Sequence, residues 1–359
     1  MTKSAGLNTL CVHAAHSPDV ATGAVAEPIH LSTTFERDAD GAYPRGYSYS
    51  REGTPNRTAL EACMATLEGG AGAAAFASGL AANIAVLELL GVGERLVASH
   101  EGYYGSLRQF RTFAALGGRG RTRLLWIETP TNPLLNVVDL KMLAALGHEA
   151  GALVVCDNTF ATPVCQRPFD FGTDLVVHSA TKYLGGHSDV LSGVVVVREG
   201  GALLEGLHDW QKTAGAALAP FDCWLLRRSL ATLGLRVRAQ CAGALRVAEF
   251  LAQHPGIEQV FYPGLAGHRG HAIAAAQMRG GFGAILSICV AGGQAAAMRV
   301  AGRTRLLTRA TSLGGVESLI EHRASIEGAG TRAPANLLRL SIGIEEADDL
   351  IDDLDQALK

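Results

Sequence analysis

The sequence predicts an α/β protein with a mostly parallel sheet, helices on both faces of that sheet, and a smaller α+β domain at the C-terminal end. Short, nearly all-apolar runs alternate with helix-like stretches, as expected for strands buried on both faces. This pattern changes after about residue 228, and 359 residues suit a large domain plus a smaller one. We therefore expect an N-terminal arm (1–48), a large domain (49–228) and a C-terminal domain (229–359).

The arm is irregular in sequence, with recurrent Gly, Pro, Ser and Thr. Its apolar residues Ile29, Leu31 and Phe35 nevertheless predict that it is ordered and anchored.

The large domain is expected to alternate helices and strands, because stretches with apolar residues at helical spacing alternate with short, continuous apolar runs typical of buried strands. We expect helices at 57–68, 79–90 and 140–150, and strands at 124–127, 153–156, 174–177 and 193–197. In the C-terminal domain we expect a long helix at 225–254, strands at 259–262, 283–290 and 337–344, and a terminal helix at 346–358.

Composition excludes several classes of partner. The formal net charge is -3, from 31 basic and 34 acidic residues, and no basic block occurs, so we expect no nucleic-acid partner. The apolar runs are too short to span a bilayer and no secretory leader is recognisable, so we expect a cytoplasmic protein that does not bind membranes. The seven cysteines form no CxxC pair and no HExxH occurs, so we predict no disulfide framework and no metal site.

Polar residues whose side chains can bind a ligand or take part in catalysis follow two of the expected strands. Asp157 comes after one strand, and Ser179, Thr181 and Lys182 come after the next. Ligands of open α/β sheets bind at the carboxyl ends of the strands, so these side chains should face one crevice. A carboxylate that holds a cationic ring nitrogen, hydroxyls that hold a phosphate and a lysine that forms an imine suit pyridoxal 5′-phosphate (PLP). Taken alone, a lysine after a strand is usually a solvated lysine.

Longer motifs carry a resemblance along nearly the whole chain. They are VHA at 12–14, TGAV at 22–25, STTF at 32–35, ETPTNP at 128–133, HSATKYLGGHSD at 178–189, SLGGVESL at 312–319 and LRLSIG at 338–343. With them the sequence resembles the Cys/Met metabolism family of PLP enzymes, which groups cystathionine γ-synthases, cystathionine γ-lyases and methionine γ-lyases. The resemblance implies the PLP-dependent transferase fold type I, with the cofactor held by Lys182 as a Schiff base and by Asp157 at the ring nitrogen.

The resemblance implies further cofactor contacts. Gly79 and Leu80, at a helix start after Ser78, would hold the phosphate, because free N–H groups at a helix N-terminus suit an anion; Ser78 is also a plain N-cap. Tyr103 would stack on the ring and move protons, although Tyr104 stands where the family has a glycine, so the assignment could shift by one residue.

Contacts between subunits and with the substrate follow in the same way. Tyr49 and Arg51 would reach the phosphate of a neighbouring subunit, which makes the protein at least a dimer in a mostly tetrameric family; the alternative for Arg51 is a surface arginine. Asn132 would lie near the phenolic oxygen of the cofactor or act as a turn residue. Arg339, with Ser312, would bind the substrate α-carboxylate; a structural buried salt bridge is the alternative for Arg339.

The implied activity is γ-elimination or γ-replacement on a sulfur amino acid or O-activated homoserine. Water would give a 2-oxo acid plus ammonia, and a thiol would give a thioether. Ser48 and Thr311 replace glutamates that cystathionine enzymes are thought to use for the distal ammonium, and Gly105 replaces the cysteine of methionine γ-lyases. Alternatives are therefore a methionine γ-lyase or an O-acylhomoserine sulfhydrylase, then an aminotransferase, or a catalytically silent protein of this fold.

The chain also departs from the family in length. Between Tyr103 and Glu128 it is shorter than the family pattern by roughly one strand and part of a helix. Either the sheet lost an element or a loop is missing from the sequence, with a join expected near 114–120.

Overall fold

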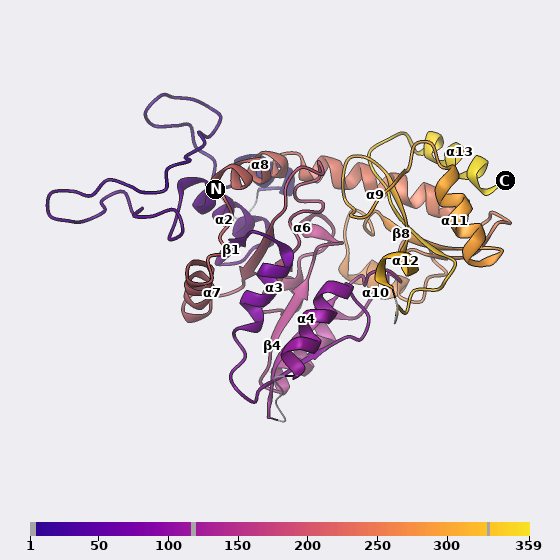
Figure 1. The fold of residues 1–359 in the computed structure, drawn as a ribbon, viewed down its shortest axis with the longest axis horizontal. Helices are drawn as coiled ribbons and strands as arrows, with labels where there is room; N and C mark the ends of the chain where they lie inside the picture. The colour runs from indigo at the N-terminus through magenta and orange to yellow at the C-terminus, as the bar shows by residue number, and fades with distance from the viewer. Residues whose placement is uncertain (1–4, 116–119, 329–330) are drawn as a thin grey trace.

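A computed structural model describes residues 5–115, 120–328 and 331–359. After helix α1 (Leu7–His13), the arm projects from the body of the molecule as long loops (Figure 1). Thr34 of the arm bridges Tyr49, the first residue of the expected large domain, and the Trp224 indole donates to the Glu27 carbonyl of the arm at 2.9 Å. The expected apolar anchoring is wrong for Leu31, which is 71% exposed, because the arm has no cover from its own chain there.

The large sheet has six strands in the order β1-β6-β5-β4-β3-β2. Strands β2 to β5 are parallel to one another, and β6 runs antiparallel to both β5 and β1, so the sheet is mostly parallel as predicted. The bounds are β1 (Gly72–Phe76), β2 (Arg95–Ala98), β3 (Thr122–Glu128), β4 (Leu153–Asp157), β5 (Leu175–His178) and β6 (Gly193–Val197).

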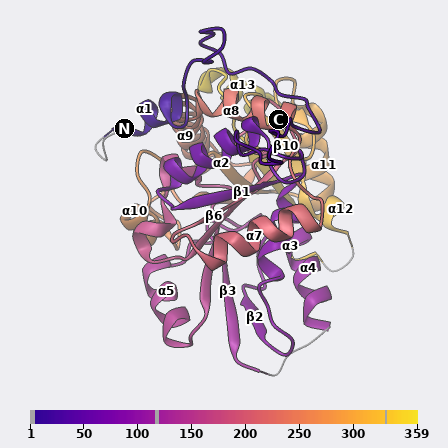
Figure 2. The same cartoon turned by 90° about the vertical axis from the view of Figure 1, so that its left-hand side faces the viewer.

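Helices cover both faces of this sheet (Figure 2). Along β6, Val194 and Val196 pack into one core while Val195 and Val197 pack into another, because successive side chains of a strand point to opposite faces. Both faces are thus apolar, which explains the unbroken run of valines. The helices are α2 (Pro55–Glu68), α3 (Gly79–Leu87), α4 (Tyr104–Ala115), α5 (Leu140–Glu149), α6 (Thr162–Cys165), the 3-10 turn η1 (Pro168–Phe171) and α7 (Ala202–Thr213).

The C-terminal part contains a second, five-stranded sheet in the order β7-β8-β11-β10-β9. One long helix was expected at 225–254, but two helices occur, α8 (Pro220–Leu230) and α9 (Leu233–Leu251), separated by a turn at Ala231 and Thr232. The other elements are β7 (Ile257–Phe261), α10 (His271–Gln277), β8 (Ile285–Val290), α11 (Gly293–Arg303), β9 (Thr308–Arg309), β10 (Leu319–His322), α12 (Arg323–Glu327), β11 (Leu337–Ser341) and α13 (Ala347–Leu358). The division into domains after residue 228, which lies within α8, stays a prediction.

Two strands of the large sheet escaped the sequence analysis. Strand β1 is rich in alanine, which strands disfavour, and β2 has only four residues and lies at the sheet edge. Because β2 already pairs with β3, any strand lost between α4 and β3 would have belonged on the free side of β2. Most of the expected join at 114–120 lies outside the described residues.

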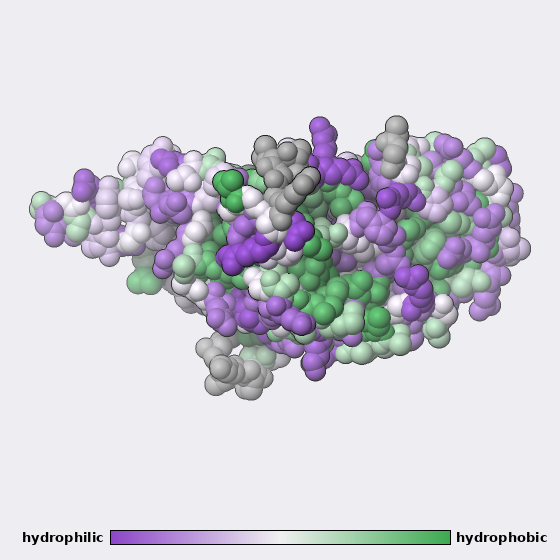
Figure 3. Space-filling model, turned by 90° about the horizontal axis from the view of Figure 1, so that it is seen from below, coloured by the Kyte–Doolittle hydropathy of each residue, from purple (hydrophilic) through white to green (hydrophobic). Residues whose placement is uncertain are grey.

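Exposed apolar residues are not spread evenly over the surface. Seen from below, apolar residues gather in the middle of one face (Figure 3). Within the described residues, no helix combines the length and the hydrophobicity needed to cross a bilayer.

Candidate active site

A cavity of about 330 Å³ lies at the carboxyl ends of the parallel strands. It brings together side chains from both sheets and from the loops that follow β3, β4 and β5. All the predicted site residues line it except Tyr49 and Arg51. The predicted residues that line it are Gly79, Leu80, Tyr103, Asn132, Asp157, Ser179, Thr181, Lys182, Ser312 and Arg339.

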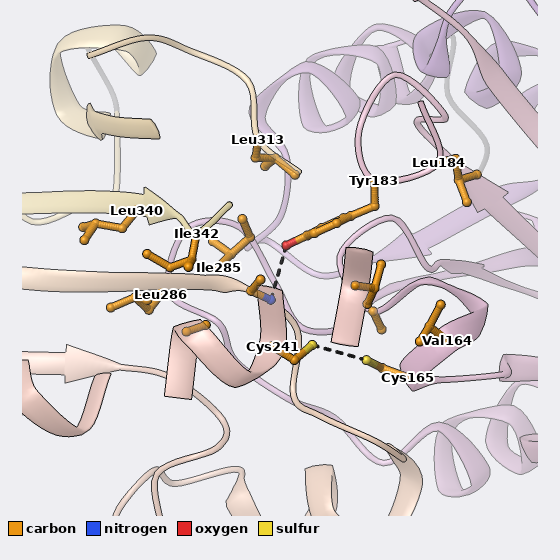
Figure 4. Packing of buried hydrophobic residues seen from close by; sticks show 14 of the residues in the cluster. Val164, Cys165, Tyr183, Leu184, Cys241, Ile285, Leu286, Leu313, Leu340 and Ile342 are labelled. Carbon is orange, nitrogen blue, oxygen red and sulfur yellow. Dashed lines mark hydrogen bonds between the residues drawn. The ribbon is translucent and has the colours of Figure 1, made fainter. Parts of the chain in front are cut away.

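Lys182 is held in the cavity by its buried neighbour Tyr183. Figure 4 shows the Tyr183 side chain in the apolar core, where its hydroxyl accepts a hydrogen bond from the Ala284 backbone N–H at 3.3 Å. The Lys182 Nζ donates to the Ser312 Oγ at 3.1 Å. Burial, with Arg339 nearby, lowers the pKa of Lys182 to about 8. At pH 7 roughly a tenth of its amine is therefore neutral and nucleophilic, far more than for a solvent-exposed lysine.

A strained loop brings Ser312 to the lysine. Ser312 has φ 86° and Gly314 has φ 76°, in the region that favours glycine. A Cβ added to Gly314 would lie 2.7 Å from the Tyr183 nitrogen, so only glycine allows this close approach. Backbone strain of this kind is common at functional sites, and here it places a hydroxyl beside the amine of Lys182.

Asp157 ends β4 beside Glu128, its register partner on β3. Loss of solvent raises the pKa of Asp157, and the same effect together with the Asp157 charge raises the pKa of Glu128 to about 8. The Asp157 Oδ1 accepts a hydrogen bond from the Thr159 N–H at 3.0 Å, and no lysine or arginine of the described chain forms an ion pair with it. A poorly solvated carboxylate that lacks a cation fits a protonated ring nitrogen.

A phosphate cradle lies at the start of α3. The Ser78 side chain caps the helix by accepting from the Ala81 N–H at 3.1 Å. A Cβ at Gly79 would lie 2.9 Å from the Ser179 Cβ, so glycine lets the two segments meet. The Ser179 hydroxyl makes no hydrogen bond within the described chain, whereas the Thr181 hydroxyl donates to the Ser192 carbonyl at 3.1 Å. Ser179 is thus the freer of the two hydroxyls.

Both tyrosines after β2 line the cavity. The Tyr103 N–H donates to the Glu128 Oε2 at 2.8 Å, and the ring centroids of Tyr103 and Tyr104 lie 4.9 Å apart. Burial raises the pKa of the Tyr103 phenol. Tyr103 is half-buried and Tyr104 is 43% exposed, so Tyr103 is the better-packed candidate for stacking on a ring.

Arg339 projects from β11 and is 4% exposed. It donates to the Asn132 Oδ1 at 3.2 Å and to the Ser312 carbonyl at 2.7 Å, and it forms an ion pair with Glu321 at 2.7 Å. Burial, with Arg323 nearby, lowers its pKa to about 10. The buried salt bridge considered as an alternative is therefore present, and it coexists with a guanidinium on the cavity wall.

Sequence reasoning missed Glu321 and Arg323. Both are buried charged residues, and Arg323 lines the cavity beside Arg339. The available signal was the run Leu319 to Arg323, in which charges end an apolar strand, because unpaired charges are costly at such positions.

Tyr49 and Arg51 follow directly after the arm and lie outside the cavity of their own chain. Arg51 donates to the Lys212 carbonyl at 3.1 Å, and its guanidinium lies 5.5 Å from the Tyr49 ring centroid. Tyr49 is 43% exposed. Neither residue can therefore serve this cavity from its present place.

A mostly parallel sheet with a desolvated lysine and an uncompensated aspartate at the ends of adjacent strands defines a PLP-dependent enzyme of fold type I. The chain belongs to the Cys/Met metabolism PLP-dependent enzyme family, whose model matches residues 8–118 and 115–359.

Known relatives extend over nearly the full length. The chain is 45% identical to the cystathionine gamma-synthase of Mycobacterium tuberculosis, over 98% of this chain and 97% of that one. It is 40% identical to the cystathionine gamma-lyase of Bacillus subtilis, over 98% of each. The crystal structure of the cystathionine gamma synthase from Xanthomonas oryzae in complex with aminoacrylate and cysteine superposes with a TM-score of 0.94 at 42% identity, and it covers 99% of this chain and 98% of that one.

The length difference also shows in these comparisons. The alignment with the mycobacterial synthase runs over 377 positions, more than the 359 residues of this chain. The two family matches meet at residues 115–118, within the segment where the sequence suggests a join.

Proposed function

We propose that this protein catalyses γ-elimination or γ-replacement on a sulfur amino acid or an O-activated homoserine. The observation that carries the proposal is the desolvated Lys182 amine, 3.1 Å from the Ser312 Oγ, in one cavity with Asp157 and Arg339. The printed names of the relatives, cystathionine gamma-synthase and cystathionine gamma-lyase, support this reaction class.

Each residue then has a role. PLP, when bound, supplies an electron sink for the Cα carbanion. Asp157 would keep the ring nitrogen protonated, and the Lys182 amine would take up and return protons at the substrate carbons. Arg339 binds the α-carboxylate, with a planar guanidinium suited to that group. Tyr103 would cover the ring, and Gly79, Leu80 and Ser179 would hold the phosphate.

The cavity favours a substrate whose distal end carries no ammonium. Thr311 lines the cavity at a position where cystathionine enzymes typically have a glutamate, and Ser48 stands in the arm at the other such position. Release of 2-oxobutyrate from cystathionine should therefore be slow relative to its release from methionine or an O-acylhomoserine. A methionine γ-lyase and an O-acylhomoserine sulfhydrylase remain the alternatives within this class.

The test is 2-oxobutyrate release by the PLP-loaded enzyme, with L-cystathionine, L-methionine and O-acylhomoserines compared side by side, each with and without L-cysteine or sulfide. Formation of a thioether at the expense of 2-oxobutyrate identifies γ-replacement. Amino-group transfer to a 2-oxo acid without 2-oxobutyrate would instead identify an aminotransferase. No turnover of any of these substrates by fully loaded enzyme would refute the proposal and support the catalytically silent alternative.

The arm supports a homo-oligomer with a shared site. Val20, Val25 and Leu31 are 101%, 72% and 71% exposed along one projecting segment, and several exposed apolar side chains on such a segment suit burial against a second subunit. Tyr49 and Arg51 would then serve the neighbouring cavity. Two inactive variants, Arg51→Ala and Lys182→Ala, should regain part of the activity when they are mixed, unfolded and refolded together. No regain in co-purified hybrids would exclude a shared site.

A cytoplasmic location is part of the same proposal. All seven cysteines are free and buried, as expected in a reducing compartment.

A further inference from the structure

Four charged side chains form an alternating series beside the cavity. The Glu321 Oε2 accepts from Arg339 at 2.7 Å and from Arg323 at 2.6 Å, so two guanidinium groups share one oxygen. Arg323 also pairs with Glu327 at 2.9 Å. The side chains of Arg339, Glu321 and Arg323 are 4%, 5% and 2% exposed, which removes most solvent screening from these contacts.

This arrangement bears on how Arg339 can bind an anion. A carboxylate paired with Arg339 alone would neutralise the cation that a substrate carboxylate needs. Because Arg323 pulls on the same Glu321 oxygen, the negative charge of Glu321 is divided between two cations. Glu327 in turn balances Arg323, so the series carries no net charge and Arg339 keeps binding capacity at its end.

Arg323 is also connected to the other side of the cavity. Its guanidinium carbon lies 5.8 Å from the centroid of the Tyr104 ring, and Tyr104 packs edge-on against Tyr103 at 4.9 Å. Arg323 lines the cavity, and its Nε is buried and lacks a hydrogen-bond partner in the described chain. An unpartnered buried N–H on a residue that lines a ligand cavity indicates that the side chain is placed there for function as well as for folding.

We propose that Arg323 is a positioning residue for substrate recognition. By pairing with Glu321, Arg323 prevents that carboxylate from fully neutralising the positive charge of Arg339, and so it preserves the site for the substrate α-carboxylate. This inference rests on the proposed role of Arg339 in carboxylate binding. It concerns every α-amino acid substrate equally, whatever its leaving group, because the series lies at the carboxylate end.

The experiment measures binding of two probes to the PLP-loaded enzyme by the change in visible absorbance of the cofactor. L-norvaline carries the α-carboxylate, and butylamine offers the same amine without it. In Arg323→Met the dissociation constant of L-norvaline should rise roughly tenfold, as expected for an added buried charge–charge penalty, while that of butylamine stays unchanged. Arg323→Lys should lie between the wild type and Arg323→Met.

A double variant gives the sharper result. Glu321→Gln combined with Arg323→Met should bind L-norvaline more tightly than Arg323→Met alone, because the uncompensated carboxylate is gone. Two outcomes would overturn the proposal and indicate a merely structural role. One is that Arg323→Met weakens the binding of L-norvaline and butylamine equally, and the other is that the double variant binds L-norvaline no more tightly than Arg323→Met. The function of Arg339 is tested separately: if the wild type binds both probes equally well and Arg339→Met changes neither, the carboxylate assignment itself fails.

Discussion

Replacing Asp157 by asparagine should stabilise the cofactor-free protein and strongly impair the enzyme. Asparagine keeps an oxygen that can accept the hydrogen bond from the Thr159 N–H. The substitution removes a carboxyl group whose pKa is raised by poor solvation and which lies opposite Glu128 where β3 pairs with β4. Relief of such strain at functional sites typically gains about 0.5–2 kcal/mol in the free energy of unfolding. For a chain of this size we expect a rise of about 0.5–3 °C in the melting temperature of the cofactor-free protein.

The cost should appear only when the cofactor is bound. A neutral amide cannot keep the ring nitrogen protonated, so the stabilisation of developing negative charge is lost. Losing one preorganised electrostatic group typically lowers kcat about 100- to 1000-fold. The assay is 2-oxobutyrate release at saturating PLP on the best substrate, paired with thermal unfolding of the cofactor-free protein.

Asp174 provides a matched control, at the turn that leads into β5. It is also buried, but it pairs with Arg198 at 2.6 Å and with His148 at 2.8 Å, and it accepts from the Val154 N–H at 2.8 Å. Asp174→Asn should therefore lose about 1–3 kcal/mol of stability and keep its kcat. The reasoning is refuted if Asp157→Asn is less stable than the wild type without cofactor, or if it retains most of its kcat.

Three further predictions test the site. Lys182→Ala should lose the imine absorbance of the bound cofactor, and its persistence would remove Lys182 from the role of cofactor lysine. Since the lowered pKa of Lys182 is about 8, the rate at which cofactor-free protein takes up PLP should rise as pH increases from 6, with a midpoint near 8; a flat profile would contradict a titrating amine. Gly314→Ala should destabilise the protein by roughly 1–3 kcal/mol and raise KM, because a Cβ would lie 2.7 Å from the Tyr183 nitrogen at a φ of 76°; unchanged stability and KM would show that the loop bends without cost.

Much of the fold of this protein, and the position of its candidate site, could be predicted from the sequence alone. The valine run of β6 predicts a strand buried on both faces, and Asp157 and Lys182 follow such strands at the edge where ligands bind. Local pattern was sufficient to place these strands and the residues after them, because burial and strand length are properties of neighbouring residues. The cofactor role of Lys182 rested on the longer motifs that resemble the family, since a lysine after a strand is by itself usually solvated. The same logic failed for β1, since an alanine-rich strand carries little local signal.

Only the tertiary structure decided which distant charges meet. Arg339 and Arg323 share one oxygen of Glu321 because β10 and β11 pair in antiparallel register, with Glu321 opposite Arg339. Likewise the Ser312 hydroxyl reaches Lys182 through a loop that only Gly314 allows to approach Tyr183. Contacts of this kind depend on register and on close approach across the chain. The sequence therefore predicted Lys182 as the cofactor lysine and Arg339 as the carboxylate-binding arginine, while the fold supplied the neighbours that shift their pKa values.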